Sequence, residues 1–589
     1  MNFDSKLFLP VLISTLVGCV SDHDVKIDQN AGKTPSSASQ TLIIQEQELR
    51  DDLEESLAGQ VAHDQASIRT VATEQLSKQK NTYKRSLEKS YIQTPMPSQL
   101  FDPKDMPPSF YQDNDREQYA SLAHNPVKQV ASEPVSTFSI DVDTGSYTNI
   151  RRMLNHGSLP PVDAVRIEEM INYFDYAYET PDINEAPFSI QTELAISPWS
   201  KDHVLLRVGL KGYEPIQEKR PASNLVFLLD VSGSMNSPDK LPLLKKSLLL
   251  LSKQLKASDK VAIVVYAGAS GVVLEPTEGN QTLKIEQALE NLSAGGSTNG
   301  QAGIQMAYQL AKKSYDPSGI NRVILATDGD FNVGTSDLDS LKKLIEQKRE
   351  EGISLTTLGF GTGNYNDELM EQLANVGNGN YAYIDGLNEA RKVLVEELSS
   401  TLMTIAKDVK IQVEFNPALV KEYRLLGYEN RALAREDFNN DKVDAGEIGA
   451  GHTVTALYEL VLQGSDGQRV DPLRYQDEPK TNVKTKLIDQ AANELAFIKF
   501  RYKALNETKS KLIARPIILP TQITAFEQAS EDFRFSATVA EFGEVLRQSK
   551  YVSGLDYASM IEHALNAKGS DPFGYRSEFI QLLRLASNL

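Results

Sequence analysis

Residues 224–234 read Asn224-Leu225-Val226-Phe227-Leu228-Leu229-Asp230-Val231-Ser232-Gly233-Ser234. The five apolar residues at its centre are typical of a parallel strand that is covered on both faces of a sheet. The polar residues come directly after this run, where such a strand would end. The stretch therefore predicts a buried parallel strand that carries an aspartate and two serines at its carboxyl end.

Strands and helices continue to alternate after this stretch. Apolar strands are expected at 261–266, 272–274, 322–326, 354–360 and 381–384, and helices at 241–255, 285–292, 300–312, 338–350, 367–374 and 387–402. Strands that alternate with helices of this length form a mostly parallel sheet with helices on both faces. We therefore predict an α/β fold, a doubly wound sheet that spans residues 223–402.

Two further polar loops lie in this block, Gly295-Gly296-Ser297-Thr298-Asn299 and Thr327-Asp328-Gly329. Loops at the carboxyl ends of parallel strands meet at one edge of the sheet. Two carboxylates and three hydroxyls should gather there, from Asp230, Ser232, Ser234, Thr298 and Asp328. Small, hard oxygen donors suit Mg²⁺, which prefers about six oxygens in an octahedron. The loops predict a divalent-cation site for Mg²⁺, with Mn²⁺ or Ca²⁺ as alternatives.

The same loops resemble the metal-ion-dependent adhesion site of von Willebrand factor A domains, which occur in integrins and many bacterial surface proteins. The resemblance spans residues 224–402 and all five motif positions. It implies that Ser232, Ser234 and Thr298 touch the metal, while Asp230 and Asp328 hold it partly through water. It also implies that a carboxylate from a protein partner completes the shell. The alternative, a chance Asp-x-Ser-x-Ser string, does not account for the other two loops.

The flanks extend the resemblance. Residues 138–144 with Arg166-Ile167-Glu168-Glu169, and Asp571-Pro572-Phe573-Gly574-Tyr575-Arg576 near the end, are similar to a bacterial family of A-domain lipoproteins. That family has uncharacterised regions on both sides of its A domain. The resemblance implies a fold and a location but no settled biochemical role.

The N-terminus predicts export and a lipid anchor. The apolar run 7–18 is too short to span about 30 Å of hydrocarbon but fits a secretory signal, residues 1–18. Leu16-Val17-Gly18-Cys19 resembles a bacterial lipobox, with Cys19 as the lipidated residue and the sole membrane attachment. Val20, by the same resemblance, favours the outer membrane of a Gram-negative bacterium. A simple signal peptide, or a buried helix with a chance cysteine, is the alternative.

The rest of the chain divides by composition. Residues 19–135 predict a tether, disordered or partly helical, with Ser-rich and Pro-rich ends. Residues 136–222 should hold helices at 147–154 and 164–174 and strands at 188–194 and 203–210. Residues 403–589 should hold strands at 409–415, 423–428, 453–462 and 497–502, then helices at 537–547, 557–567 and 575–586. Because the ends of an A domain lie close together, we expect strands from both flanks to build one shared β-sandwich.

The sequence lacks the motifs that common enzyme classes require. Asp143-Thr144-Gly145-Ser146 imitates the loop of aspartic proteases, which need two aspartates that share a proton, and no second such loop exists. Helix capping is the expected role of Asp143 and Thr144, with Ser146 as an alternative cap. The sequence has no Gly-x-Ser-x-Gly, HExxH or phosphate-loop motif. We therefore predict that the protein is not an enzyme.

Two acidic stretches resemble calcium loops only weakly. The stretch from Asp328 to Asn332 has Val333 where a calcium loop needs glycine. The second stretch is expected to be a solvated turn, with calcium binding as the alternative; it holds Asp437, Asn439, Asp441 and Asp444.

Charge narrows the class of partner. The net charge is −19, which argues against nucleic acid because phosphate binding needs basic surface. The sequence thus predicts a lipid-anchored envelope protein that presents a metal-bearing A domain to an acidic residue of a protein partner, or serves as a scaffold. The alternative is a structural or regulatory envelope subunit in which the metal only stabilises the fold.

Overall fold

The computed structural model describes residues 117–182, 186–214, 220–329, 331, 338–471, 493–505, 507–552 and 556–589. The predicted signal peptide, Cys19 and nearly all of the predicted tether lie outside these ranges. Within them, none of the helices has the length and apolar character that crossing a bilayer requires.

The predicted α/β sheet is confirmed. Its six strands run in the order β10-β9-β8-β5-β6-β7, and all are parallel except β7, which pairs antiparallel with β6 at one edge. Every residue of β5 is buried, as its apolar run predicts. The bounds are β5 Ser223–Asp230, β6 Lys260–Tyr266, β7 Ser270–Glu278, β8 Ile320–Thr327, β9 Ser354–Phe360 and β10 Tyr381–Ile384.

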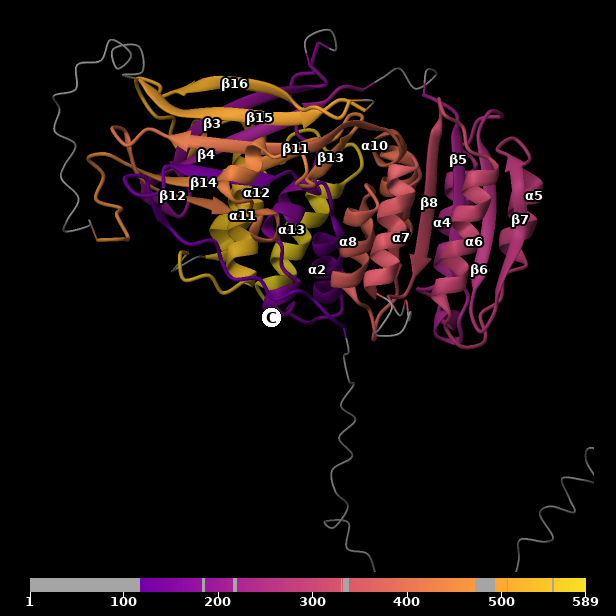
Figure 1. Ribbon diagram of the computed structural model, residues 1–589. Coiled ribbons are helices and arrows are strands. Elements are labelled where there is room, and N and C mark those ends of the chain that lie inside the picture. Colours follow the sequence, from indigo (N-terminus) through magenta and orange to yellow (C-terminus); the bar gives the residue numbers. More distant parts are fainter. Residues whose placement is uncertain are drawn as a thin grey trace, which may run out of the picture. The chain divides into compact units, whose positions relative to one another are not determined.

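Helices cover both faces of this sheet (Figure 1). They are α4 Leu241–Ser252, α5 Thr282–Glu290, α6 Gly300–Lys313, α7 Leu338–Glu350 and α8 Asp367–Val376. The single helix predicted at 387–402 is wrong. It is broken into α9 Leu387–Arg391, a π-helical turn over Lys392–Glu396 and α10 Leu398–Leu402. In this turn the Lys392 side chain is buried, where its ammonium pairs with Glu397 and lies 4.5 Å from the ring centre of Tyr173.

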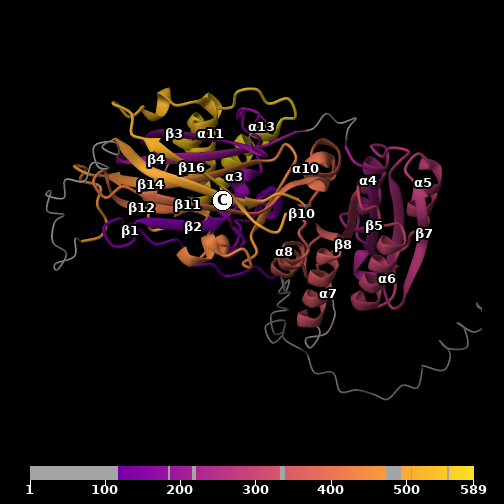
Figure 2. The ribbon, with the colours of Figure 1, turned by 45° about the horizontal axis from the view of Figure 1, so that its top comes forward.

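Strands from both flanks build one β-sandwich, which confirms that prediction. β4 pairs antiparallel with β14 along eight residue pairs, so strands from before and after the A domain are direct neighbours. One sheet has the order β1-β12-β14-β4-β3, and the other has the order β13-β11-β15-β16, with β2 also paired to β11. Figure 2 shows the A domain beside the sandwich. In the sequence, the A domain lies between β4 and β11.

The sandwich strands run as follows: β1 Lys128–Gln129, β2 Val135–Ser139, β3 Phe188–Ser197, β4 Ser200–Gly212, β11 Thr404–Phe415, β12 Val420–Leu426, β13 Gly446–Gly449, β14 Thr453–Leu462, β15 Glu494–Lys503 and β16 Lys511–Ile518. Consecutive residues are buried over the centre of β4, so both faces of this strand are covered. The reason is a third layer, because helices cover the outer face of this sheet.

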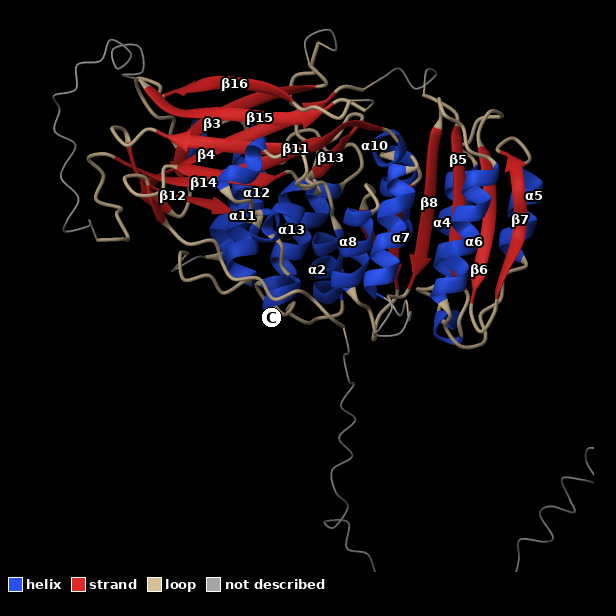
Figure 3. Cartoon of the chain, viewed as in Figure 1, coloured by secondary structure: helices blue, strands red, loops and turns tan. Residues whose placement is uncertain are grey.

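That third layer combines helices from both flanks (Figure 3). It contains α2 Gly145–Asn155, α3 Ile167–Asn172, α11 Glu531–Leu546, α12 Tyr557–Asn566 and α13 Tyr575–Ala586. Their apolar faces share one core with Leu205 of β4 and Leu457 of β14. The regions before and after the A domain are therefore one body that the A domain interrupts.

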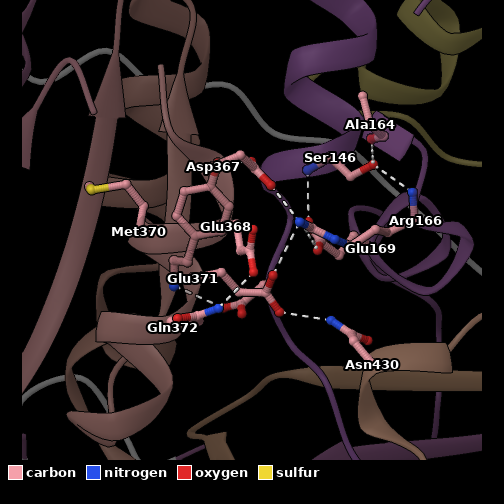
Figure 4. A network of polar contacts seen from close by, with 12 residues as sticks. Ser146, Ala164, Arg166, Glu169, Asp367, Glu368, Met370, Glu371, Gln372 and Asn430 are labelled. Atoms are coloured by element: carbon pink, nitrogen blue, oxygen red, sulfur yellow. Dashed lines mark hydrogen bonds and ion pairs between the residues drawn. The ribbon is translucent and has the colours of Figure 1, made fainter. Parts of the chain in front are cut away.

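A buried arginine joins this body to the A domain (Figure 4). The guanidinium of Arg166 is 2.8 Å from Glu169 in the body, and 2.5 Å and 3.2 Å from Asp367 and Glu371 of α8. Arg166 is 2% exposed, so these charges meet away from water. Glu169 also accepts a 2.7 Å hydrogen bond from the backbone N–H of Ser146 at the start of α2.

The predicted capping roles of Asp143, Thr144 and Ser146 are wrong. Thr144 stands at the N-cap of α2, but its side chain makes no capping hydrogen bond, because the carboxylate of Glu169 serves the first turn instead. Asp143 accepts a 2.8 Å hydrogen bond from Tyr381 N–H in β10 and pairs with Arg431 at 3.1 Å. Asp143 is thus a buried interface residue.

We expect Arg166→Ala to lower the free energy of unfolding by about 3–5 kcal/mol, because three buried carboxylates lose their common counter-ion. Chemical denaturation of the full chain measures this loss. Lys313→Ala is the control: it breaks a pair with Glu275 in which both side chains are more than half exposed, and should change stability by less than about 1 kcal/mol. A loss below about 1 kcal/mol for Arg166→Ala would contradict the role given to this residue.

Stability should also fall as pH rises, because of Glu168. Its side chain is fully buried. Burial, and then the nearby Glu429 and Asp141 carboxylates, raise the pKa of Glu168 from 4.5 to about 8. The folded chain therefore keeps a proton that the unfolded chain releases above pH 4.5. The stabilisation from this proton is complete below pH 4.5 and lost by about pH 8.

Glu168→Gln replaces the protonated carboxyl with a neutral group of the same shape. We expect the variant to lose less stability than wild type between pH 5 and 8, a difference on the order of 2 kcal/mol. Denaturation at several pH values tests this, with the exposed Glu436→Gln as control. Parallel pH profiles for wild type and Glu168→Gln would disprove the assignment.

Candidate metal centre

Two of the three predicted loops lie at the carboxyl ends of strands, whereas residues 295–299 connect α5 to α6. Asp230 is the last residue of β5, and Asp328 directly follows β8. The first two loops are joined by backbone hydrogen bonds, because Gly233 N–H donates to the Gly296 carbonyl at 3.0 Å and Gly295 N–H donates to the Val231 carbonyl at 2.8 Å. The structure thus brings these loops to one edge of the sheet.

The Asp230 side chain is held by local and distant groups. One carboxylate oxygen accepts from Ser232 N–H at 2.8 Å, which is the turn that an aspartate makes with the residue two positions on. The other oxygen accepts from the hydroxyls of Thr327 at 3.0 Å and Tyr266 at 3.2 Å. Burial raises the pKa of Asp230 to about 6, against the effect of the Ser232 hydrogen bonds. A cation beside this carboxylate would stabilise its charged form.

The two serine hydroxyls are spaced as metal ligands would be. Ser232 Oγ and Ser234 Oγ are 3.0 Å apart. Two oxygens at neighbouring corners of an octahedron with bonds of about 2.1 Å are about 3.0 Å apart. The donor set of two carboxylates and hydroxyls is also of the hard oxygen type that Mg²⁺ prefers. The residues present therefore fit the predicted ion.

Access to the site comes from the hydroxyl side. Asp230, Ser232 and Asp328 are buried, whereas Ser234 is exposed and Thr298 is half-buried. Thr298 lies on the second loop, two residues after Gly296 and just before α6. A ligand from outside would meet Ser234 and Thr298 first, with Ser232 and the two carboxylates beneath them.

Asp328 has a partner that the sequence analysis missed. The ammonium of Lys240 donates to Asp328 Oδ2 at 2.9 Å, and both side chains are buried. Lys240 stands at the N-cap of α4, where a basic residue is disfavoured by the positive end of the helix. That unfavourable placement was the available signal. The contacts of Tyr266 and Thr327 with Asp230 left no signal in the sequence, because they depend on how β6 and β8 lie beside β5.

Other acidic loops do not form comparable sites. Among the described residues, no group of three or more His, Cys, Asp or Glu side chains could hold a metal. In the acidic loop that follows β12, the Lys410 ammonium donates to the carbonyls of Asp437 and Asn440, and the carboxylates of Asp441 and Asp444 pair with Arg501 and Arg349. The calcium alternative for this loop is therefore not supported. Asp330, Asn332 and Val333 lie outside the described residues.

Comparison with protein families divides the chain in the same places. Residues 224–396 match the von Willebrand factor type A domain, residues 113–207 match a family described as von Willebrand factor, and residues 400–589 match a family described as the C-terminal region of the uncharacterized protein YfbK. The A-domain match begins in β5 and ends at the π-helical turn.

Individual proteins are also similar to this chain. The uncharacterized protein YfbK of Escherichia coli is 48% identical over 477 residues, which are 80% of this chain and 81% of that protein. Human inter-alpha-trypsin inhibitor heavy chain H3 is 24% identical over 41% of this chain and 28% of its own length. A solved von Willebrand factor type A structure from Catenulispora acidiphila is 15% identical and covers 70% of this chain and 91% of that one, with a TM-score of 0.37.

Proposed function

Because the chain belongs to the family of Escherichia coli YfbK and carries a von Willebrand factor A domain, we propose that it is a binding protein whose A domain captures a protein partner through a divalent cation. Ser232, Ser234 and Thr298 would contact the ion directly, with Asp230 and Asp328 behind them. The bound ion would supply positive charge to a carboxylate of the partner.

One observation carries the proposal: the hydroxyl of the exposed Ser234 lies 3.0 Å from the hydroxyl of the buried Ser232, whose backbone N–H donates to the buried Asp230. Hydroxyls are neutral ligands, and only two carboxylates face the ion. The ion would therefore keep enough positive charge to attract an anionic group. Mg²⁺ is the expected ion, with Mn²⁺ or Ca²⁺ as alternatives.

Binding is favoured over catalysis by the surroundings of the residues that imitate an enzyme. Asp143 is buried and paired with Arg431, so it is not placed to act on a substrate. The inter-alpha-trypsin inhibitor heavy chains, which match part of this chain, carry the name of inhibitor chains. A second candidate function remains a structural envelope subunit in which the metal only stabilises the fold.

We further propose that the protein is lipid-anchored at Cys19 and faces the cell envelope, most simply at an outer membrane. The support is the lipobox-like sequence before the only cysteine of the chain. One acyl-bearing cysteine on a long tether would leave the A domain free to meet partners at the membrane surface.

Asp230→Ala should weaken Mg²⁺ binding at least tenfold, or about 1.4 kcal/mol, because the remaining hydroxyls cannot replace a carboxylate for a strongly hydrated ion. The fold should survive, since the rest of β5 supplies the core. Calorimetric titration measures the affinity. Asp239→Ala is the matched control, because it removes the same charge nearby but outside the five motif positions. Equal Mg²⁺ affinity in wild type and Asp230→Ala would refute the site.

The same variant separates the two candidate functions. Capture of a partner from envelope extract should be lost in Asp230→Ala and in wild type with chelator. If the metal-free variant still captures the partner, the metal has only a structural role.

Cys19→Ser should release the mature chain into the soluble fraction, because it removes the only proposed attachment to the membrane. Fractionation followed by a high-salt wash measures this. A variant that stays in the washed membrane pellet would disprove the lipid anchor.

A further inference from the structure

We propose that Lys240 is the internal cation of the candidate metal centre. Its ammonium holds Asp328 in the metal-free protein and has to leave Asp328 when a divalent ion binds, so Lys240 sets how tightly the site takes metal. This inference rests on the metal site proposed above and adds a residue that the five motif positions do not include.

The contact between the two side chains is close and shielded. Lys240 Nζ lies 2.9 Å from Asp328 Oδ2, and the side chains are 8% and 0% exposed. A buried ammonium is strongly unfavourable unless it is paired, and the same holds for a buried carboxylate. Each group therefore satisfies the other as long as no ion is present.

The absence of a side chain at Gly361 leaves space for the aliphatic part of the Lys240 side chain. A Cβ atom on Gly361 would lie 2.3 Å from both Cγ and Cε of Lys240, so any side chain at 361 would displace the lysine. Gly361 also has φ of +71°, and its carbonyl accepts a 2.7 Å hydrogen bond from the Tyr383 hydroxyl. The Lys240 stem thus packs directly against the backbone of the loop after β9.

Helix stability does not explain a lysine at this position. Lys240 is the N-cap residue of α4, and its side chain makes no capping hydrogen bond. Ser, Thr, Asp and Asn are the residues that stabilise an N-cap, and positive charge is unfavourable there. Among the contacts that Lys240 makes, only the pair with Asp328 accounts for its charge.

The pair has a direct consequence for metal binding. Two carboxylates facing one ammonium leave a net charge of about −1, in place of the −2 that would draw a dication, and charges shielded from water interact strongly. The oxygen that accepts from Lys240 also has to be given up, or shared, for Asp328 to serve the ion. The ammonium and the divalent ion therefore compete for Asp328, and the metal-free domain stays folded.

Lys240→Met keeps the length of the stem and removes the charge. We expect Mg²⁺ to bind at least tenfold tighter than in wild type by calorimetry. In chelator, the variant should melt at a lower temperature than wild type, because the buried Asp328 carboxylate loses the ammonium of Lys240 as its counter-ion. Adding Asp328→Asn to Lys240→Met should recover part of that loss. Lys240→Gln, which retains a neutral donor, serves the same purpose should Lys240→Met fail to fold.

Lys245→Met is the matched control. Lys245 lies on the same helix, and its ammonium donates to the carbonyls of Glu290 and Leu292 rather than to a carboxylate. Its removal should change Mg²⁺ affinity less than threefold.

The outcomes separate this inference from the function it rests on. Wild type that binds Mg²⁺, with Lys240→Met binding equally or more weakly, overturns the competition and leaves the metal site standing. If neither protein binds Mg²⁺, the site and the competition both fall. An unchanged melting temperature of Lys240→Met in chelator overturns the claim that Lys240 holds Asp328.

Discussion

The arrangement of this protein depends on a buried arginine that faces carboxylates from two parts of the chain. Arg166 comes from the body, Asp367 and Glu371 come from the inserted A domain, and all three are almost fully buried. Removing one partner of such a contact leaves a buried charge without compensation, which is strongly destabilising. The contact therefore couples the body to the A domain. Arg151 repeats the device with Asp385 and Glu389 of the A domain and with Glu578 of α13.

The internal cations differ in kind between the interface and the candidate metal centre. The ion pairs across the interface use arginines, whose planar guanidinium stays charged and can serve several carboxylates at fixed angles. The metal centre uses Lys240, a single ammonium on a flexible stem that contacts Asp328. The arginines suit a permanent joint, and the lysine suits a contact that can be exchanged. In a chain with a net charge of −19, basic side chains are thus placed where carboxylates would otherwise be buried alone.

One short segment connects these features. Gly361 makes room for Lys240, and Asn366 forms a parallel β-bridge with Gln118. The Asp367 N–H donates a hydrogen bond to the Gln118 carbonyl at 3.1 Å, while the Asp367 side chain accepts one from Arg166. Residues 361–367 therefore contact Lys240 beside the candidate site, Gln118, and Arg166 at the joint between body and A domain. A partner bound at the candidate site would lie close to all three.

The sequence by itself determined the A domain and most of its candidate site. Apolar runs and helical spacing are local properties, so β5 and its neighbours could be predicted, and the turn at Asp230 follows from the aspartate itself, whose carboxylate accepts from the backbone N–H two residues on. Only the tertiary structure decided which charges meet. Lys240 and Asp328 are 88 positions apart, and Arg166 and Asp367 are 201 apart. The cap of α2 by Glu169 and the π-helical turn at Lys392 belong to the same class. Periodicity tells which face of an element is buried, but the partner of a buried charge depends on which other element arrives there, and residue spacing carries no record of that.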